Sequence, residues 1–154
     1  METRQGYASD RNSPKWQRWQ PGKDVAAEPF DQWRLNVLRA TGQGKRFDRV
    51  RLVDNPLTEG QYFLLTTASN NVAAREDIRN LFRRDAARLG LPDFDFWLFD
   101  SRILARFVFG GDEPVLGVVL TEDPADSDSV GGGGRQPRGP EGYCRPFSVP
   151  RREQ

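Results

Sequence analysis

Carboxylate and guanidinium groups carry most of the chemistry open to this chain, because its 154 residues include no histidine. That absence excludes Ser-His-Asp and Cys-His nucleophilic sites, histidine-ligated zinc and histidine general bases. The single cysteine, Cys144, excludes an internal disulfide and a cysteine-based metal cluster, which is typical of a protein from a reducing cytoplasm. A metal site made of carboxylates alone would suit magnesium or manganese.

A charged turn after the most aromatic stretch of the chain is the centre of our candidate site. The proposed ligand- or partner-binding residues are Arg51, Glu76, Arg79, Asp100 and Arg102. Arg51 shares one face of a predicted strand with Arg49, and two arginines on one face can bind a phosphate or a carboxylate. Such a pair is more often solvated or paired with local acids. Asp100 could equally cap its turn and pair with an arginine.

A magnesium-dependent phosphodiesterase or nuclease is the main enzymatic alternative. Glu76, Asp95 and Asp100 would hold the metal, and Arg79 or Arg102 would stabilise a phosphate. Asp95 and Asp100 have opposite parity in one predicted strand and would lie roughly 16 Å apart, which disfavours a shared ion. We therefore predict no metal, no cofactor and no catalytic residue, and we favour a protein without enzymatic activity.

Length and charge narrow the remaining classes of protein. A chain of this length predicts one domain with a modest core. The 23 basic and 22 acidic residues give a net charge of +1, so we predict neither direct nucleic-acid binding nor a membrane surface. No run of 18 apolar residues predicts a membrane span, and the N-terminus has no apolar signal segment. These features together predict a cytoplasmic protein.

Three strands are predicted to follow one another in the second half of the chain, at 94–99, 103–109 and 115–120. Apolar residues on both faces of each run indicate strands that are covered on both sides. Gly110-Gly111-Asp112 is a strong hairpin signal between the last two. The sequence therefore predicts an antiparallel meander of buried strands, which would present the candidate turn at 100–102.

The first half is predicted to supply a helix and a strand. Residues 28–41 form an amphipathic helix, with Pro29 at a first helical position, and 45–53 form an alternating strand. Residues 57–67 are a short helix if Thr58 and Gln61 make a capping box, or else a strand. Ser69-Asn70-Asn71 is a loop.

The segment 72–89 allows two interpretations. Helical propensity favours one long helix. The alternative is a strand at 78–82 followed by a helical turn at 84–89.

The whole chain is predicted to be an α+β protein with a mostly antiparallel sheet, packed by an N-terminal amphipathic helix and short helices. Residues 1–27 are an arm whose aromatic residues, Tyr7, Trp16 and Trp19, should pack on the domain. Residues 28–124 are the domain itself. Residues 125–154 are rich in Gly, Pro and Arg and are predicted to be a disordered tail.

Several short motifs resemble a known family. They are Glu2-Thr3-Arg4 with Tyr7, Gly44-Lys45-Arg46-Phe47 leading into Arg49-Val50-Arg51-Leu52-Val53, Asn71-Val72-Ala73-Ala74 with Glu76-Asp77-Ile78-Arg79, and Asp95-Phe96-Trp97-Leu98-Phe99-Asp100. Over roughly residues 1–124 the chain is similar to an actinobacterial domain-of-unknown-function family, common in Streptomyces, whose genes often sit beside Xre-type helix-turn-helix regulators. The resemblance implies a regulator as partner, and it favours the strand at 78–82.

The chain departs from that family at both ends. Members usually have a few residues before the equivalent of Glu2, which suggests that Met1 starts late. Members also continue after Asp123-Pro124 into an aromatic, Arg-rich helix, whereas this chain becomes rich in Gly, Pro and Arg. We hypothesise a frameshift or a decayed end.

Our preferred function is a non-enzymatic regulatory or ligand- or partner-binding module that works with a helix-turn-helix regulator. A distant analogy of element order with phospholipase-D-like sensor domains agrees with this function, because a chain without histidine cannot carry their catalytic His-x-Lys signature. A magnesium-dependent phosphodiesterase or nuclease is one alternative. A toxin–antitoxin component whose basic tail acts in trans is another.

Overall fold

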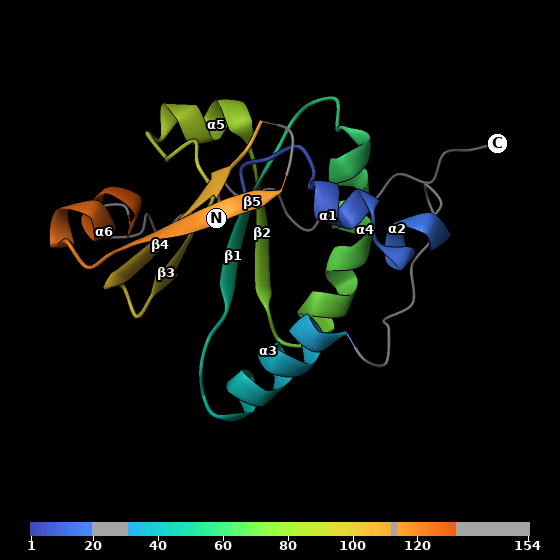
Figure 1. Ribbon diagram of the computed structural model, residues 1–154, viewed down its shortest axis with the longest axis horizontal. Helices are drawn as coiled ribbons and strands as arrows, with labels where there is room; N and C mark the ends of the chain where they lie inside the picture. The colour runs from blue at the N-terminus through green and yellow to red at the C-terminus, as the bar shows by residue number, and fades with distance from the viewer. Residues whose placement is uncertain (20–30, 112–113, 132–154) are drawn as a thin grey trace.

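The computed structural model describes residues 1–19, 31–111 and 114–131, and it has an α+β fold (Figure 1). The strands are β1 (Asp48–Val53), β2 (Asp77–Phe82), β3 (Phe96–Phe99), β4 (Ile103–Phe109) and β5 (Val115–Thr121). The helices are α1 (Ala8–Arg11), α2 (Pro14–Arg18), α3 (Gln32–Gly42), α4 (Glu59–Ala73), α5 (Arg83–Arg88) and α6 (Pro124–Gly131). None of these helices is both long and apolar enough to span a bilayer.

The C-terminal meander is confirmed. Strands β3, β4 and β5 pair antiparallel in that order, and the hairpin between β4 and β5 falls at the predicted glycines, although Asp112 lies outside the described residues. Strands β1 and β2 form a separate parallel pair, which the prediction of a mostly antiparallel sheet did not specify. A parallel pair needs a crossover connection, and helix α4 provides it.

Helix α4 begins as its local sequence predicts. The Thr58 hydroxyl accepts a hydrogen bond from the backbone N–H of Gln61, and the side-chain oxygen of Gln61 accepts one from the backbone N–H of Thr58, so the capping box is present. The prediction of a loop at 69–71 is wrong, because the helix runs through these residues to Ala73. It ends where Arg75 adopts a φ of 70° and the N–H of residue 76 bonds to the carbonyl of Asn71.

The strand interpretation of 78–82 is confirmed, and the single helix over 72–89 is wrong. Strand β2 spans Asp77–Phe82 because each of its residues lies beside a residue of β1, from Asp48 to Val53. Tertiary pairing here overrides helical propensity. Helix α3 begins at Gln32, with the Asp31 carboxylate as its N-cap, and residues 28–30 of the predicted helix lie outside the described residues.

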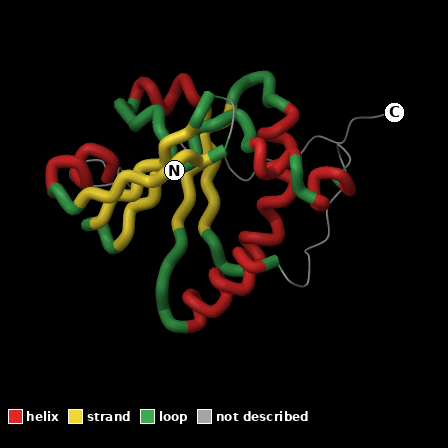
Figure 2. Tube along the Cα trace, in the orientation of Figure 1, coloured by secondary structure: helices red, strands yellow, loops and turns green. Residues whose placement is uncertain are grey.

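Residues 1–3 join the two sheets edge to edge. The backbone of Met1 exchanges two hydrogen bonds with Phe96 of β3, at 2.6 and 3.2 Å. Glu2 donates to the carbonyl of Val50 and accepts from the N–H of Leu52, both on β1, at 2.9 and 2.8 Å. The N-terminal segment therefore lies between β1 and β3, where Figure 2 marks the N-terminus.

The rest of the described arm packs on α4. Trp16, Trp19 and Phe63 form one aromatic cluster, with ring centroids 4.7 to 5.6 Å apart. Gly60, at the start of α4, lies against the arm backbone so closely that an added Cβ would be 2.5 Å from the carbonyl oxygen of Gln5. The arm and α4 thus meet through backbone contact as well as through rings.

The prediction that the third strand of the meander is buried is wrong. In β5, Leu116 is 70% exposed and Leu120 is 66% exposed, and the other apolar residues of the strand are exposed as well. The physical reason is that no described element packs on the faces of β5, which is also the edge strand of its sheet.

The predicted start of the disordered tail is wrong for residues 125–131. These residues belong to α6, where Val130 is buried against Phe96 and Leu104, and the Ser127 hydroxyl donates to the carbonyl of Arg102 at 2.9 Å. The polar composition of this segment predicted disorder, but its single valine, Val130, is buried in the core. The remaining tail, 132–154 with Cys144, lies outside the described residues, as do residues 20–27 of the predicted arm.

Candidate functional site

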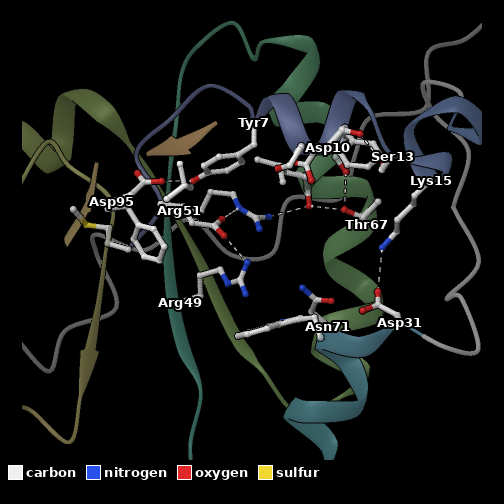
Figure 3. A pocket seen from close by; sticks show the side chains of 18 of the residues that line it. Tyr7, Asp10, Ser13, Lys15, Asp31, Arg49, Arg51, Thr67, Asn71 and Asp95 are labelled. Carbon is white, nitrogen blue, oxygen red and sulfur yellow. Dashed lines mark hydrogen bonds and ion pairs between the residues drawn. The ribbon is translucent and has the colours of Figure 1, made fainter. Parts of the chain in front are cut away.

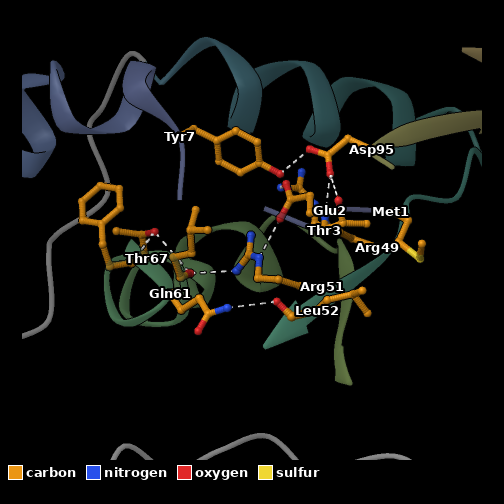
Figure 4. Close-up of polar contacts among 12 residues, drawn as sticks. Met1, Glu2, Thr3, Tyr7, Arg49, Arg51, Leu52, Gln61, Thr67 and Asp95 are labelled. Atoms are coloured by element: carbon orange, nitrogen blue, oxygen red, sulfur yellow. Dashed lines mark hydrogen bonds and ion pairs between the residues drawn. The ribbon is translucent and has the colours of Figure 1, made fainter. Parts of the chain in front are cut away.

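A network of ion pairs connects strand β1 to the N-terminal segment through Glu2 and to the start of β2 through Glu76. Arg51 is 2% exposed, and its Nε donates to the Glu2 carboxylate at 2.6 Å while Nη1 donates to the carbonyl of Leu64 in α4 at 2.9 Å. The second oxygen of Glu2 bonds Arg49, which also bonds Glu76 at 2.6 Å. One carboxylate therefore lies between two arginines of the same strand face (Figure 4).

The turn between α4 and β2 positions Glu76 in this network. The left-handed turn at Arg75 ends α4 and starts β2, which places Glu76 just before β2 and on the side of Arg49. The indole N–H of Trp33, on α3, donates to the other oxygen of Glu76 at 3.2 Å. Both oxygens of this buried carboxylate are thus bonded to protein donors.

Asp95 is a further buried acid, outside the network of ion pairs. Its carboxylate accepts from the Thr3 backbone N–H at 2.6 Å, from the Thr3 hydroxyl at 2.7 Å and from the Tyr7 hydroxyl at 2.6 Å (Figure 4). Burial and the nearby carboxylates Glu2 and Asp95 raise the pKa of Tyr7, so its hydroxyl stays a proton donor. Asp95 thereby fixes the start of the arm without meeting a cationic side chain.

Burial alone would raise the pKa of Glu2, but Arg51 and Arg49 outweigh it and hold that pKa below its ordinary value. Glu2 therefore stays ionised at neutral pH. Arg49 and Arg51 each have a carboxylate partner, so their positive charge is largely neutralised within the protein.

A cavity of about 470 Å³ opens beside this network of ion pairs, between the arm, β1 and α4 (Figure 3). We call it the arm cavity. Its polar and charged lining residues include Glu2, Asp10, Ser13, Lys15, Asp31, Arg49, Arg51, Thr67, Asn71 and Asp95. Its aromatic lining residues are Tyr7, Trp33, Phe63, Trp97, Phe107 and Phe109. Polar groups set among aromatic walls at this volume are typical of small-molecule sites.

Asp10, on α1, is the acid of this cavity to which the described residues supply no partner. No described residue donates a hydrogen bond to its carboxylate or forms an ion pair with it, whereas Lys15 lies 3.7 Å from Asp31. Figure 3 shows Asp10 between Tyr7 and Ser13 on the arm side of the cavity. Burial, and then the nearby Glu2 carboxylate, raise the pKa of Asp10 to about 6.

The charge of Asp10 should cost stability at neutral pH. Because its folded pKa is raised, its favourable contribution is complete near pH 4 and is lost as the pH rises through about 6. We expect Asp10→Asn to increase the free energy of unfolding by roughly 1–2 kcal/mol at pH 7.5, after allowance for partial exposure. In urea unfolding, the gain should vanish near pH 4. Asp93→Asn, an exposed control, should be neutral at both pH values; a gain for Asp10→Asn that is equal at both would contradict this account.

Comparison with known protein families shows a match over most of the chain. The family model for a domain of unknown function (DUF6879) matches residues 1–130. The chain belongs to this family. The match reaches α6, beyond residue 124, where the resemblance was expected to end. No curated protein and no solved structure matches the chain.

The structure of this DUF6879 chain brings together two of the five candidate residues. Arg51 and Glu76 belong to the same buried network through Glu2 and Arg49. Arg79 points to the opposite face of β2, where it bonds Asp77 at 2.6 Å. Its exposed pairing is typical of a solvated face.

Asp100 and Arg102 lie apart from this network, at the β3–β4 turn. Asp100 and Ser101 are its two central residues, with φ of 50° and 54°, and the N–H of Arg102 bonds to the carbonyl of Phe99 at 2.9 Å. Two positive φ values are typical of the tight hairpin turns that match strand twist. Arg102 is exposed and lies 3.9 Å from Glu122. The turn has the backbone geometry of a hairpin, and its described outside contacts are with Glu122 and with the Ser127 hydroxyl of α6.

The acids proposed for magnesium are not brought together. Glu76 is bonded to Arg49 and Trp33, Asp95 to Thr3 and Tyr7, and Asp100 is on the exposed turn. Within residues 1–19, 31–111 and 114–131, no three metal-binding side chains form a group that could hold an ion.

Glu2 and Asp10 are the site residues that sequence reasoning missed. Both lie in the polar arm, and neither has a periodic pattern that marks it as buried. The available signal for Glu2 was its place in the family-like Glu2-Thr3-Arg4 motif.

Proposed function

We propose that this chain is a non-enzymatic regulatory module that binds a small molecule in the arm cavity and a helix-turn-helix regulator on strand β5. The observation that carries the proposal is an open cavity of about 470 Å³ whose two arginines are already neutralised by carboxylates. Arginine stays protonated, and Arg51 and Arg49 lower the pKa of Glu2, so these groups can shape and orient a ligand but are weak general acids and bases at neutral pH. Binding suits this arrangement better than catalysis.

Strand β5 is the surface that we assign to the protein partner. It carries no ionisable side chain, its apolar residues are exposed, and it pairs on one side only, with β4. An exposed apolar edge strand is a template for a strand of another chain. Glu122 and Asp123 follow β5 and are exposed, so the fitting segment is extended, apolar and basic at one end. A helix-turn-helix regulator is the partner that the family resemblance implies.

Capture of the helix-turn-helix regulator that the family resemblance implies tests this proposal. The full chain should retain that regulator in a pull-down, and Leu116→Lys should abolish retention because it places a charge on the docking strand. Leu89→Lys is the matched control, since Leu89 is 65% exposed but lies at the end of α5, and it should retain the regulator.

Three outcomes would count against the proposal. No capture by the unmodified chain would contradict the regulatory role. Equal capture by Leu116→Lys would remove β5 from the interface. Self-association in sedimentation that Leu116→Lys abolishes, without capture of the regulator, would assign the strand to a second copy of this chain.

A further inference from the structure

We infer that the ligand of the arm cavity is a small organic cation, an ammonium group on a flat apolar body, with the ammonium at Asp10. This inference rests on the proposed function, because it names the class of ligand for the same cavity. It follows from three properties of the cavity: which of its charges are already matched, what its walls are made of, and how large it is.

The charges of the cavity exclude an anionic ligand. Four acidic and three basic side chains line it, together with Met1, whose N-terminal ammonium donates to the carbonyl of Phe96. Each base already has an acid partner: Arg49 and Arg51 share Glu2, and Lys15 lies 3.7 Å from Asp31. An anion would have to compete with these carboxylates for every basic side chain, and it would also face their negative charge.

The same charges favour a cation at one point. Asp95 already accepts three hydrogen bonds, whereas no described residue bonds the Asp10 carboxylate. An unmatched carboxylate at the wall of a cavity destabilises the empty protein, and an ammonium group relieves that cost by forming a charge-assisted hydrogen bond. The raised pKa of Asp10 agrees with this, because it reports an ionised form without a partner.

The walls suit a flat apolar body. The indoles of Trp33 and Trp97 lie with ring centroids 5.2 Å apart, and Tyr7 lies 6.2 Å from Phe109. Aromatic faces stack on ring systems and also attract cations. A volume of about 470 Å³ accommodates a molecule of one or two rings with a short side chain.

Calorimetric titration of the full chain with two matched probes tests the inference. Tryptamine and indole-3-propionate have the same ring and a two-carbon linker, but the first ends in an ammonium and the second in a carboxylate. At pH 7.5 we expect tryptamine to bind and indole-3-propionate not to bind. Asp10→Asn should weaken tryptamine binding by about tenfold or more, since it removes the partner of the ammonium.

The control and the contrary outcomes separate this inference from the proposed function. Asp93→Asn, an exposed change of the same kind, should leave tryptamine affinity unchanged. Asp10→Asn is expected to fold, because it removes an unfavourable charge. Tryptamine binding that Asp10→Asn does not weaken would overturn the inference. Binding of indole-3-propionate alone would overturn the cation while leaving a binding module. Binding of neither probe, with the regulator still captured, would overturn the ligand class only.

Discussion

Glu2→Gln is expected to lower the free energy of unfolding by about 3 kcal/mol or more, the cost of breaking a buried ion pair from one side. The change keeps the size of the side chain but removes the charge between Arg49 and Arg51. Arg51 is 2% exposed and would then keep its positive charge with neutral acceptors only, the carbonyl of Leu64 and the new side-chain amide oxygen. Urea unfolding at pH 7.5, compared with the unmodified chain, measures the loss.

Glu122→Gln is the control for this experiment, because Glu122 meets Arg102 at 3.9 Å on an exposed surface. It should change stability by less than about 0.5 kcal/mol. Since Arg51 and Arg49 depress the pKa of Glu2, its contribution is present above the ordinary value of 4.5 and is lost as the pH falls. The deficit of Glu2→Gln should therefore shrink in acid. An equal deficit for Glu2→Gln and Glu122→Gln would rule out a special role for the buried network.

Gly60→Ala is expected to destabilise the protein by about 1–3 kcal/mol, although helix propensity alone would make it stabilising by about 1 kcal/mol. An alanine Cβ at this position would lie 2.5 Å from the carbonyl oxygen of Gln5 and 2.8 Å from the Cα of Gly6. Both neighbours are backbone atoms, so the arm must move away from α4. Thermal unfolding measures the change, and tryptophan fluorescence should report displacement of Trp16 and Trp19.

Gly42→Ala provides the opposite expectation in another helix. Gly42 is the last residue of α3, and a Cβ there would meet nothing within 4 Å. Alanine should leave stability unchanged or raise it by up to about 1 kcal/mol. If both alanine variants are stabilised, the close contact between the arm and α4 does not constrain the fold.

Features encoded by neighbouring residues were predictable from the sequence. The spacing of Thr58 and Gln61 predicted the start of α4, and the glycines after Phe109 predicted the hairpin before β5. Both signals act within a few residues, so no tertiary information is needed to recognise them. The strand at 78–82 was ambiguous because its helical propensity is resolved only by pairing with β1.

Features that depend on distant residues were not predictable. The alternation of β1 correctly put Arg49 and Arg51 on one face, but it could not show that Glu2 lies between them. The prediction that β5 is buried failed for a related reason, since apolar composition does not reveal whether another element covers a strand. Of the five candidate residues, Arg51 and Glu76 lie in the buried network, and the acids that the arm supplies were not among them.

The position of residues 1–3 between the two sheets has a consequence for the order in which the chain folds. The segment is synthesised before both of its partners, which lie 49 residues later at Arg51 and 95 residues later at Phe96. At about 5–20 residues per second, it must wait several seconds for the second partner to be synthesised. Contacts of such long sequence separation slow folding, because loop closure precedes any gain from the contact. The pair β1–β2 with α4 is more local, so it can form first and present the edge that the segment later joins.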